Sequence, residues 1–141
     1  MKTIYLDNNA TTAVAPEVRD AILPYLNELY GNPSSMHTFG GQVADAVETA
    51  REQMASLLGA NPDEIIFTSC GSESDTAAIW SAIQTQPEKR HLITTRVEHP
   101  AVLSVMQHWE RQGYRVTYLG VDNKGRLDLD EYAAALTPDT A

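Results

Sequence analysis

Small polar side chains and a glycine occupy residues 69–72, directly after the apolar run at residues 65–67. A pattern typical of an amphipathic helix begins immediately behind them. Where a strand is followed by a tight turn and then by the first turn of a helix, the backbone N–H groups at the helix start are free. These groups form a ready site for a phosphate or another anion. In that site Gly71 lets the backbone approach a ligand closely, and Ser72 supplies a hydroxyl.

The same residues also have an interpretation without a ligand. Ser72 can act only as an N-cap, with Asp75 as its partner in a capping box, and the spacing alone does not decide between the two roles. Glu73 and Asp75 suit a helix N-terminus in their own right, and they would compete with a phosphate unless they point away. The stretch matches neither the P-loop nor the dinucleotide-binding glycine pattern.

His99 stands just before Pro100, which suits the first position of a helix. This places the imidazole at a second junction between a strand and a helix. There it could stack on a flat ring or move a proton near neutral pH, which makes His99 a candidate catalytic and cofactor-binding residue. The alternative is a loop histidine that caps a helix or packs.

Cys70 is the only cysteine, and a nucleophile is one interpretation of it. The favoured interpretation is a small buried residue before a turn. Three further histidines, His37, His91 and His108, share no metal-like spacing with Cys70 or with one another. The sequence therefore predicts no metal site.

The elements that position these residues follow from the hydrophobic pattern. In the first part we expect a strand at residues 4–6 and a helix from Pro16 to residue 29, with a kink or break at Pro24. A loop follows at residues 30–41, and a helical stripe at residues 43–58 ends at Gly59.

From residue 63 onward, strands and helices alternate. We expect strands at residues 63–68, 92–95 and 116–119, helices at 72–84, 100–112 and 129–136, and a turn at 122–125. The alternation predicts an α/β fold with a mostly parallel sheet and flanking helices, in which ligands bind at the carboxyl ends of the strands. The segments at 69–72 and 96–100 both lie at such ends. We expect no internal domain boundary within residues 1–141.

Composition excludes several classes of function. The chain has 141 residues and a formal net charge of −9, which argues against nucleic acid and anionic membranes as partners. No run approaches the length of a membrane span, and the N-terminus lacks the apolar region of a secretory signal. A single cysteine forms no internal disulfide. These features predict a cytoplasmic location.

Five motifs in order carry a family resemblance, at residues 5–12, 31–40, 67–73, 97–102 and 121–129. The whole chain resembles the N-terminal part of the cysteine desulfurases of the NifS/IscS family, which are pyridoxal-phosphate enzymes of fold type I. Residues 68–75 are most similar to the nitrogen-fixation branch, NifS. The resemblance implies the N-terminal part of the large domain of a pyridoxal-phosphate-dependent transferase, incomplete as it stands.

The resemblance also implies roles for individual residues. Gly71 and Ser72 would hold the phosphate of pyridoxal 5'-phosphate, with Ser72 where the family usually has threonine, and His99 would stack on the pyridine ring and assist proton transfer. The family removes sulfur from L-cysteine, leaving L-alanine and an enzyme-bound persulfide. The sulfur goes to iron–sulfur cluster assembly, here for nitrogenase, through a scaffold protein, and the enzymes are typically homodimers.

Parts of the family's machinery have no counterpart in this sequence. The Schiff-base lysine, the carboxylate at the pyridine nitrogen and the nucleophilic cysteine would all lie beyond residue 141, so we expect a fragment that is inactive alone. Lys2, Lys89, Lys124 and Cys70 lie outside the matching positions for these roles. Two alternatives remain open: a selenocysteine lyase or cysteine sulfinate desulfinase of the same fold, and a non-catalytic phosphate-binding module.

Overall fold

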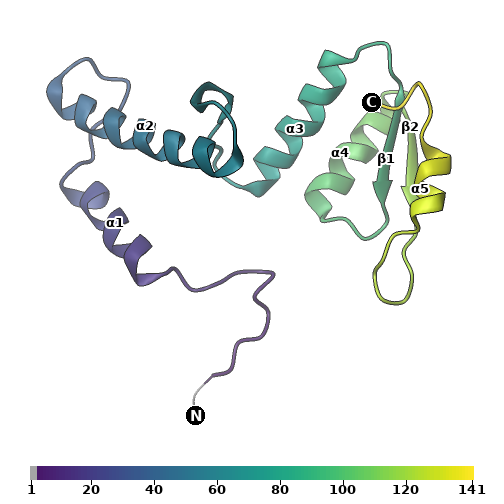
Figure 1. Ribbon diagram of the computed structural model, residues 1–141, viewed down its shortest axis with the longest axis horizontal. Helices are drawn as coiled ribbons and strands as arrows, with labels where there is room; N and C mark the ends of the chain where they lie inside the picture. Colours follow the sequence, from purple (N-terminus) through teal and green to yellow (C-terminus); the bar gives the residue numbers. More distant parts are fainter. Residues whose placement is uncertain (1–2) are drawn as a thin grey trace. The chain divides into compact units, whose positions relative to one another are not determined.

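The computed structural model describes residues 3–141, and the chain forms two compact units, one up to Ile66 and one from Phe67 to Ala141 (Figure 1). The sequence predicts no internal domain boundary within residues 1–141. This statement concerns the domains of the complete protein, and it stays a prediction. Each unit is described by itself below.

The first unit is helical in the described residues. Helix α1 spans Pro16–Asn27, helix α2 spans Thr38–Leu58, and a 3-10 turn spans Pro62–Glu64. Of the kink or break predicted at Pro24, the break does not occur, because helix α1 continues through this residue; residues 28 and 29 lie outside the helix. Helix α2 begins earlier than the hydrophobic stripe predicts, because His37 caps it, and it ends as predicted at Gly59, whose φ is +69°.

Two predicted strands do not form in the first 68 residues. Residues 4–6 have no regular secondary structure and no sheet partner, and Ile4 and Leu6 are 81% and 84% exposed. Residues 63–68 contain the end of the 3-10 turn and a segment without regular secondary structure instead of a strand. A strand needs a neighbouring backbone for its hydrogen bonds, and within residues 3–141 no strand pairs with either segment. An apolar run alone does not provide that partner.

The second unit alternates helices and strands as predicted. In order they are α3 (Gly71–Thr85), β1 (His91–Thr95), α4 (Pro100–Arg111), β2 (Arg115–Leu119) and α5 (Leu129–Ala135). Strands β1 and β2 are parallel, in a register that pairs His91 with Arg115 and Thr95 with Leu119. The parallel pairing confirms the predicted α/β class. The predicted turn at 122–125 is also present, with Gly125 at φ +76°.

The C-terminal residues add a third backbone segment beside β1. The His91 N–H donates to the carbonyl of Asp139, and the Ala141 N–H donates to the carbonyl of His91. The His91 side chain is fully buried between two threonine hydroxyls, those of Thr117 and Thr140, each 2.8 Å from a ring nitrogen. Both edges of β1 are therefore engaged at its first residue.

The core of the second unit lies between the strands and helices α3 and α4. Its buried members are Ile83, Leu92, Val105, Met106, Trp109 and Tyr114. The ring of Trp109 packs 4.6 Å from that of Trp80 and 4.9 Å from that of Tyr114, measured between centroids. This packing holds α3 beside α4, so that the two helices are fixed relative to each other (Figure 1).

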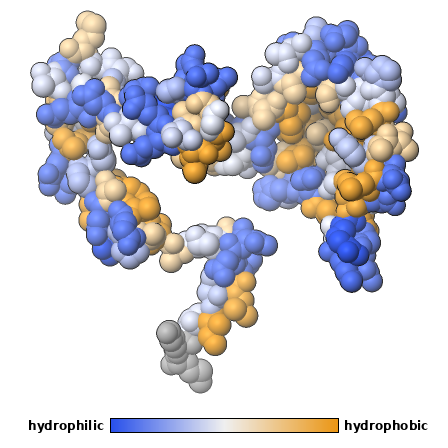
Figure 2. Space-filling model, in the orientation of Figure 1, coloured by the Kyte–Doolittle hydropathy of each residue, from blue (hydrophilic) through white to orange (hydrophobic). Residues whose placement is uncertain are grey.

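Hydrophobic residues also lie on the surface of the chain (Figure 2). In the first unit the largest exposed fractions among helical leucines are those of Leu57 and Leu26, at 78% and 71%. Among the described residues, no helix combines the length and the apolar character that a membrane crossing requires.

Candidate functional site

A pocket of about 500 Å³ lies along α3 and α4 and contains two of the three predicted site residues. Ser72, Thr76 and Trp80 line it from α3, at the four-residue spacing that places side chains on one helix face. From the α4 side it is lined by His99, Pro100, Ala101, Ser104, Val105 and His108. The structure therefore brings Ser72 and His99, which belong to different elements and are distant along the chain, to the same pocket.

Gly71 is the first residue of α3 and does not line this pocket. A Cβ placed on Gly71 would have no heavy atom within 4 Å, so the space in front of its backbone is open. The predicted close approach of a ligand to this backbone is therefore sterically allowed at the start of α3.

Ser72 is not the N-cap of α3, because Cys70 holds that position. The alternative interpretation of Ser72 as an N-cap, with Asp75 as its partner in a capping box, is therefore wrong. Within residues 3–141 the Ser72 hydroxyl has no hydrogen-bond partner, while its carbonyl accepts from the Thr76 hydroxyl at 2.8 Å. The hydroxyl is exposed at the first turn of a helix and is available to a ligand.

Side chains bridge the turn that leads into α3. Glu73 Oε2 accepts from the Ser69 N–H at 2.6 Å and from the Ser69 hydroxyl at 2.7 Å. These donors lower the pKa of the Glu73 carboxyl, the hydroxyl contributing most. The hydroxyls of Thr68 and Ser74 lie 2.6 Å apart and share a hydrogen bond. The carboxylate that could compete with a phosphate is thus turned back toward the preceding residues.

Cys70 is exposed, which corrects the expectation of a buried residue. It is the N-cap of α3, and a cap position lies at the surface rather than behind the helix. The pKa of its thiol is lowered, first by the backbone N–H of Glu73 and then by the Ser69 hydroxyl. The start of α3 therefore favours negative charge, although the thiol makes no side-chain cap hydrogen bond.

His99 is the N-cap of α4, as its alternative interpretation proposed. Its Nδ1 accepts from the Ala101 N–H at 3.1 Å, which orients the ring. The residue is exposed and also lines the pocket. Capping uses only one ring nitrogen, so the cap role leaves the Nε2 side and the ring faces for a ligand.

These groups fit the phosphate and ring of pyridoxal phosphate. A free hydroxyl and backbone N–H groups at the start of a helix are phosphate donors, and the imidazole is a flat partner for an aromatic ring. Among the residues that the structure describes, no lysine or arginine lines this pocket. The pocket thus holds donors for an anion and a planar side chain, but no amine for a Schiff base.

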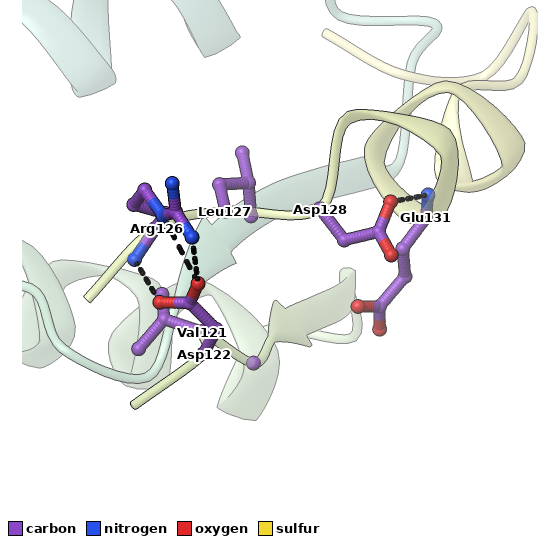
Figure 3. A pocket seen from close by; sticks show the side chains of 7 residues that line it. Val121, Asp122, Arg126, Leu127, Asp128 and Glu131 are labelled. Carbon is purple, nitrogen blue, oxygen red and sulfur yellow. Dashed lines mark hydrogen bonds and ion pairs between the residues drawn. The ribbon is translucent and has the colours of Figure 1, made fainter. Parts of the chain in front are cut away.

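A second hollow, of about 550 Å³, lies between the turn after β2 and α5 (Figure 3). The Asp122 carboxylate accepts from the backbone N–H groups of Arg126 and Lys124 and from the Arg126 side chain, and these donors, the Arg126 N–H first, lower the pKa of its carboxyl. The Asp128 carboxylate caps α5 through the N–H groups of Asp130 and Glu131. Both carboxylates already accept hydrogen bonds from neighbouring backbone N–H groups, so we assign them a structural role in the turn and in the cap of α5.

Sequence reasoning did not identify Thr76, Trp80 and His108 as part of the pocket along α3 and α4. Thr76 and Trp80 follow Ser72 at intervals of four, so the helical period contained the signal. His108 enters through α4, and only the packing of α3 against α4 reveals it. Within residues 3–141, no three His, Cys, Asp or Glu side chains converge in a way that could hold a metal ion.

Comparison with known proteins adds the family. The model of the aminotransferase class-V family matches residues 4–141. A cysteine desulfurase of Trichormus azollae is 67% identical over all 141 residues, and the cysteine desulfurase NifS of Azotobacter vinelandii is 56% identical over an alignment of 142 residues. The chain covers 35% of the length of each.

Solved structures agree with these matches. A structure titled NifS-like protein superposes with a TM-score of 0.90 at 40% identity, over 97% of this chain and 38% of that one. A structure titled SspA in complex with cysteine gives a TM-score of 0.88 at 37% identity, over 98% of this chain and 40% of that one. The chain therefore belongs to the aminotransferase class-V family, whose fold its alternating helices and parallel strands share.

Proposed function

We propose that this chain is the N-terminal part of a pyridoxal-phosphate-dependent cysteine desulfurase. The observation that carries the proposal is the pocket that Ser72 and His99 line together, at the first turns of two adjacent helices. Relatives named cysteine desulfurase, at up to 67% identity over the whole chain, support the same function. Since the chain spans about 35% of their length, the remaining catalytic groups belong to sequence outside it.

In this proposal the start of α3 binds the phosphate. Ser72 donates its hydroxyl, which has no other partner within the described residues, and the backbone N–H groups of the first turn add further donors. Gly71 keeps the approach to this backbone open. Serine in place of the family's usual threonine keeps the hydroxyl and loses only a methyl group.

His99 lies against the pyridine ring and holds or moves a proton through Nε2. Because Nδ1 accepts from the Ala101 N–H, the neutral imidazole carries its own proton on Nε2. The bound cofactor supplies an electron sink for the negative charge that develops on the amino-acid substrate. The cap on α4 keeps the imidazole oriented while this happens.

The substrate in this proposal is L-cysteine, and the products are L-alanine and an enzyme-bound persulfide. The persulfide forms on a cysteine outside this chain, and Cys70 remains part of the turn before α3. An iron–sulfur scaffold protein accepts the sulfur, in cluster assembly for nitrogenase, and the complete enzyme is a cytoplasmic homodimer. The relative named NifS supports the nitrogen-fixation assignment.

The test uses the complete gene product, with pyridoxal phosphate and either L-cysteine or L-selenocysteine. With a thiol reductant present to release the persulfide sulfur as sulfide, we expect alanine and sulfide from L-cysteine, and we expect the 141-residue chain alone to be inactive. A strong preference for L-selenocysteine would favour the lyase alternative. Binding of phosphate with no turnover of either amino acid would favour the non-catalytic module.

Ser72→Ala in the complete protein tests the phosphate site directly. A hydrogen bond to a charged group contributes roughly 1.5–3 kcal/mol, so the cofactor dissociation constant should rise about 10- to 150-fold. The matched control is Ser81→Ala, the same change at an exposed position further along α3. An unchanged dissociation constant for Ser72→Ala, measured by titration of the apo-protein, would contradict the assigned role.

A further inference from the structure

The turn before α3 is held by an acidic side chain that belongs to the helix itself. Glu73 lies in the first turn of α3, yet its carboxylate accepts from both the N–H and the hydroxyl of Ser69. At 2.6 and 2.7 Å these are short, charge-assisted hydrogen bonds. A second link joins the hydroxyls of Thr68 and Ser74 across the same turn.

The direction of the Glu73 carboxylate matters for an anion at this helix. A carboxylate near a helix start commonly bonds to the exposed N–H groups, as Asp128 does at α5. Glu73 instead turns back to Ser69, so it takes none of the N–H groups at the start of α3. The Ser72 hydroxyl beside it is likewise left without a partner in residues 3–141.

We propose that Glu73 is a positioning residue, which holds Ser69 and thereby shapes the turn so that the start of α3 stays open to the cofactor phosphate. The inference rests on the proposed function, because it concerns the same phosphate site. Glu73 touches neither cofactor nor substrate in this role. It acts through Ser69, whose hydroxyl and N–H donate to the ionised carboxylate and lower its pKa.

Two effects of Glu73 oppose each other, and substitutions separate them. Its negative charge repels a phosphate, whereas its hydrogen bonds to Ser69 hold the turn. Glu73→Gln removes the charge and keeps an acceptor oxygen, and Glu73→Ala removes both. If the positioning effect dominates, the alanine variant binds the phosphate more weakly, while the glutamine variant binds it as well as the wild type or better.

The experiment measures dissociation constants of the complete apo-protein for pyridoxal phosphate and for pyridoxal, which lacks the phosphate. We expect Glu73→Ala to raise the constant for pyridoxal phosphate about tenfold and that for pyridoxal less than about twofold. Glu73→Gln should stay within about twofold of the wild type for both ligands. The matched controls are Glu88→Ala and Glu88→Gln, at an exposed glutamate outside the turn.

Several results would overturn the proposal. The proposal fails if Glu73→Ala binds pyridoxal phosphate as tightly as the wild type does, or if this variant binds pyridoxal and pyridoxal phosphate equally more weakly. It also fails if Glu73→Gln weakens the binding of pyridoxal phosphate as much as Glu73→Ala does. If Glu73→Ala does not fold, Ser69→Ala replaces it, since that variant removes only one donor and should weaken phosphate binding selectively but less. A wild-type protein that does not prefer pyridoxal phosphate over pyridoxal would instead overturn the proposed function.

Discussion

The two units of the chain differ in how far their residues bury one another. The second unit, Phe67–Ala141, contains a cluster of six buried side chains from two helices, a strand and the residue before β2. In the first unit, among the described residues, only Ala55 and Gly40 are buried. Both units have amphipathic helices, so the helical pattern alone does not create a core.

The difference arises from what each helix packs against. In the second unit α4 contacts both β1 and β2, and α3 contacts α4, so apolar faces meet within a short stretch of chain. In the first unit, within the described residues, apolar side chains such as Leu26 of α1 and Leu57 of α2 stay largely exposed, so the packing of its helices leaves them uncovered. The proposed cofactor pocket lies within the unit that has the core, and that core supports its shape.

The largest expected effect is that of Trp109→Ala, in the core of the second unit. Removal of a buried tryptophan side chain should lower the free energy of unfolding by about 3–5 kcal/mol. The matched change in the first unit is Leu57→Ala, at a residue that is 78% exposed, and it should cost less than about 0.5 kcal/mol. Urea titration of the 141-residue chain measures both, and equal losses would show that the units do not differ as described.

A medium effect is expected where the first unit is tightly packed. A Cβ on Gly40 would lie 2.6 Å from the Asn32 carbonyl oxygen and 2.8 Å from the Ser35 Cβ. Gly40→Ala should therefore cost about 1–3 kcal/mol, through overpacking of the loop against α2. Gly41→Ala is the control, because nothing lies within 4 Å of its Cβ. Proteolysis of the loop at residues 31–37 should accelerate only in the first variant.

The smallest effect concerns pH and belongs to the second unit. Burial lowers the pKa of His91, Arg115 lowers it further, and Asp139 opposes the shift. The unfolded state therefore takes up a proton on His91 at a higher pH than the folded state. Its contribution to stability is present above the unfolded pKa of about 6.5 and is lost as pH falls from that value toward the lowered folded pKa.

The pH effect can be isolated with His91→Gln, which keeps hydrogen-bonding groups but does not titrate. The wild type should lose more stability than this variant between about pH 7.5 and about pH 5, as measured by urea titration at each pH. The other three histidines are common to both proteins, so their contributions cancel in the comparison. Parallel losses in the two proteins would contradict the assignment to His91.

Local signals predicted much of the second unit. Pro100 and Gly113 mark where α4 begins and where the chain turns after it, and the structure ends α4 at Arg111, one residue short of the prediction. The pairing of Ser72 with His99 followed from the rule that parallel strands carry ligands at their carboxyl ends. This pairing does not depend on a strand at residues 63–68, because the contact of α3 with α4 brings Ser72 and His99 to one pocket.

The predictions that failed depended on partners distant in sequence. The apolar runs at residues 4–6 and 63–68 are typical of strands, but within the described residues neither has a neighbouring backbone to pair with. The general tendency of cysteines to be buried predicts a buried Cys70, whereas the position of the helix start places it at the surface. Burial depends on the packing of whole elements, which a local pattern does not contain.

The sequence by itself determined the order of helices and strands in the second unit, the anion-favouring turn before α3, and the family. These follow from the hydrophobic period, the turn residues and the motif spacing, which are all properties of neighbouring residues. The tertiary structure decided that Glu73 turns back to Ser69, that Thr76, Trp80 and His108 share a pocket with Ser72 and His99, and that His91 is buried between two threonines. These outcomes depend on side-chain direction and on contacts between elements, which arise only when the helices pack against the strands.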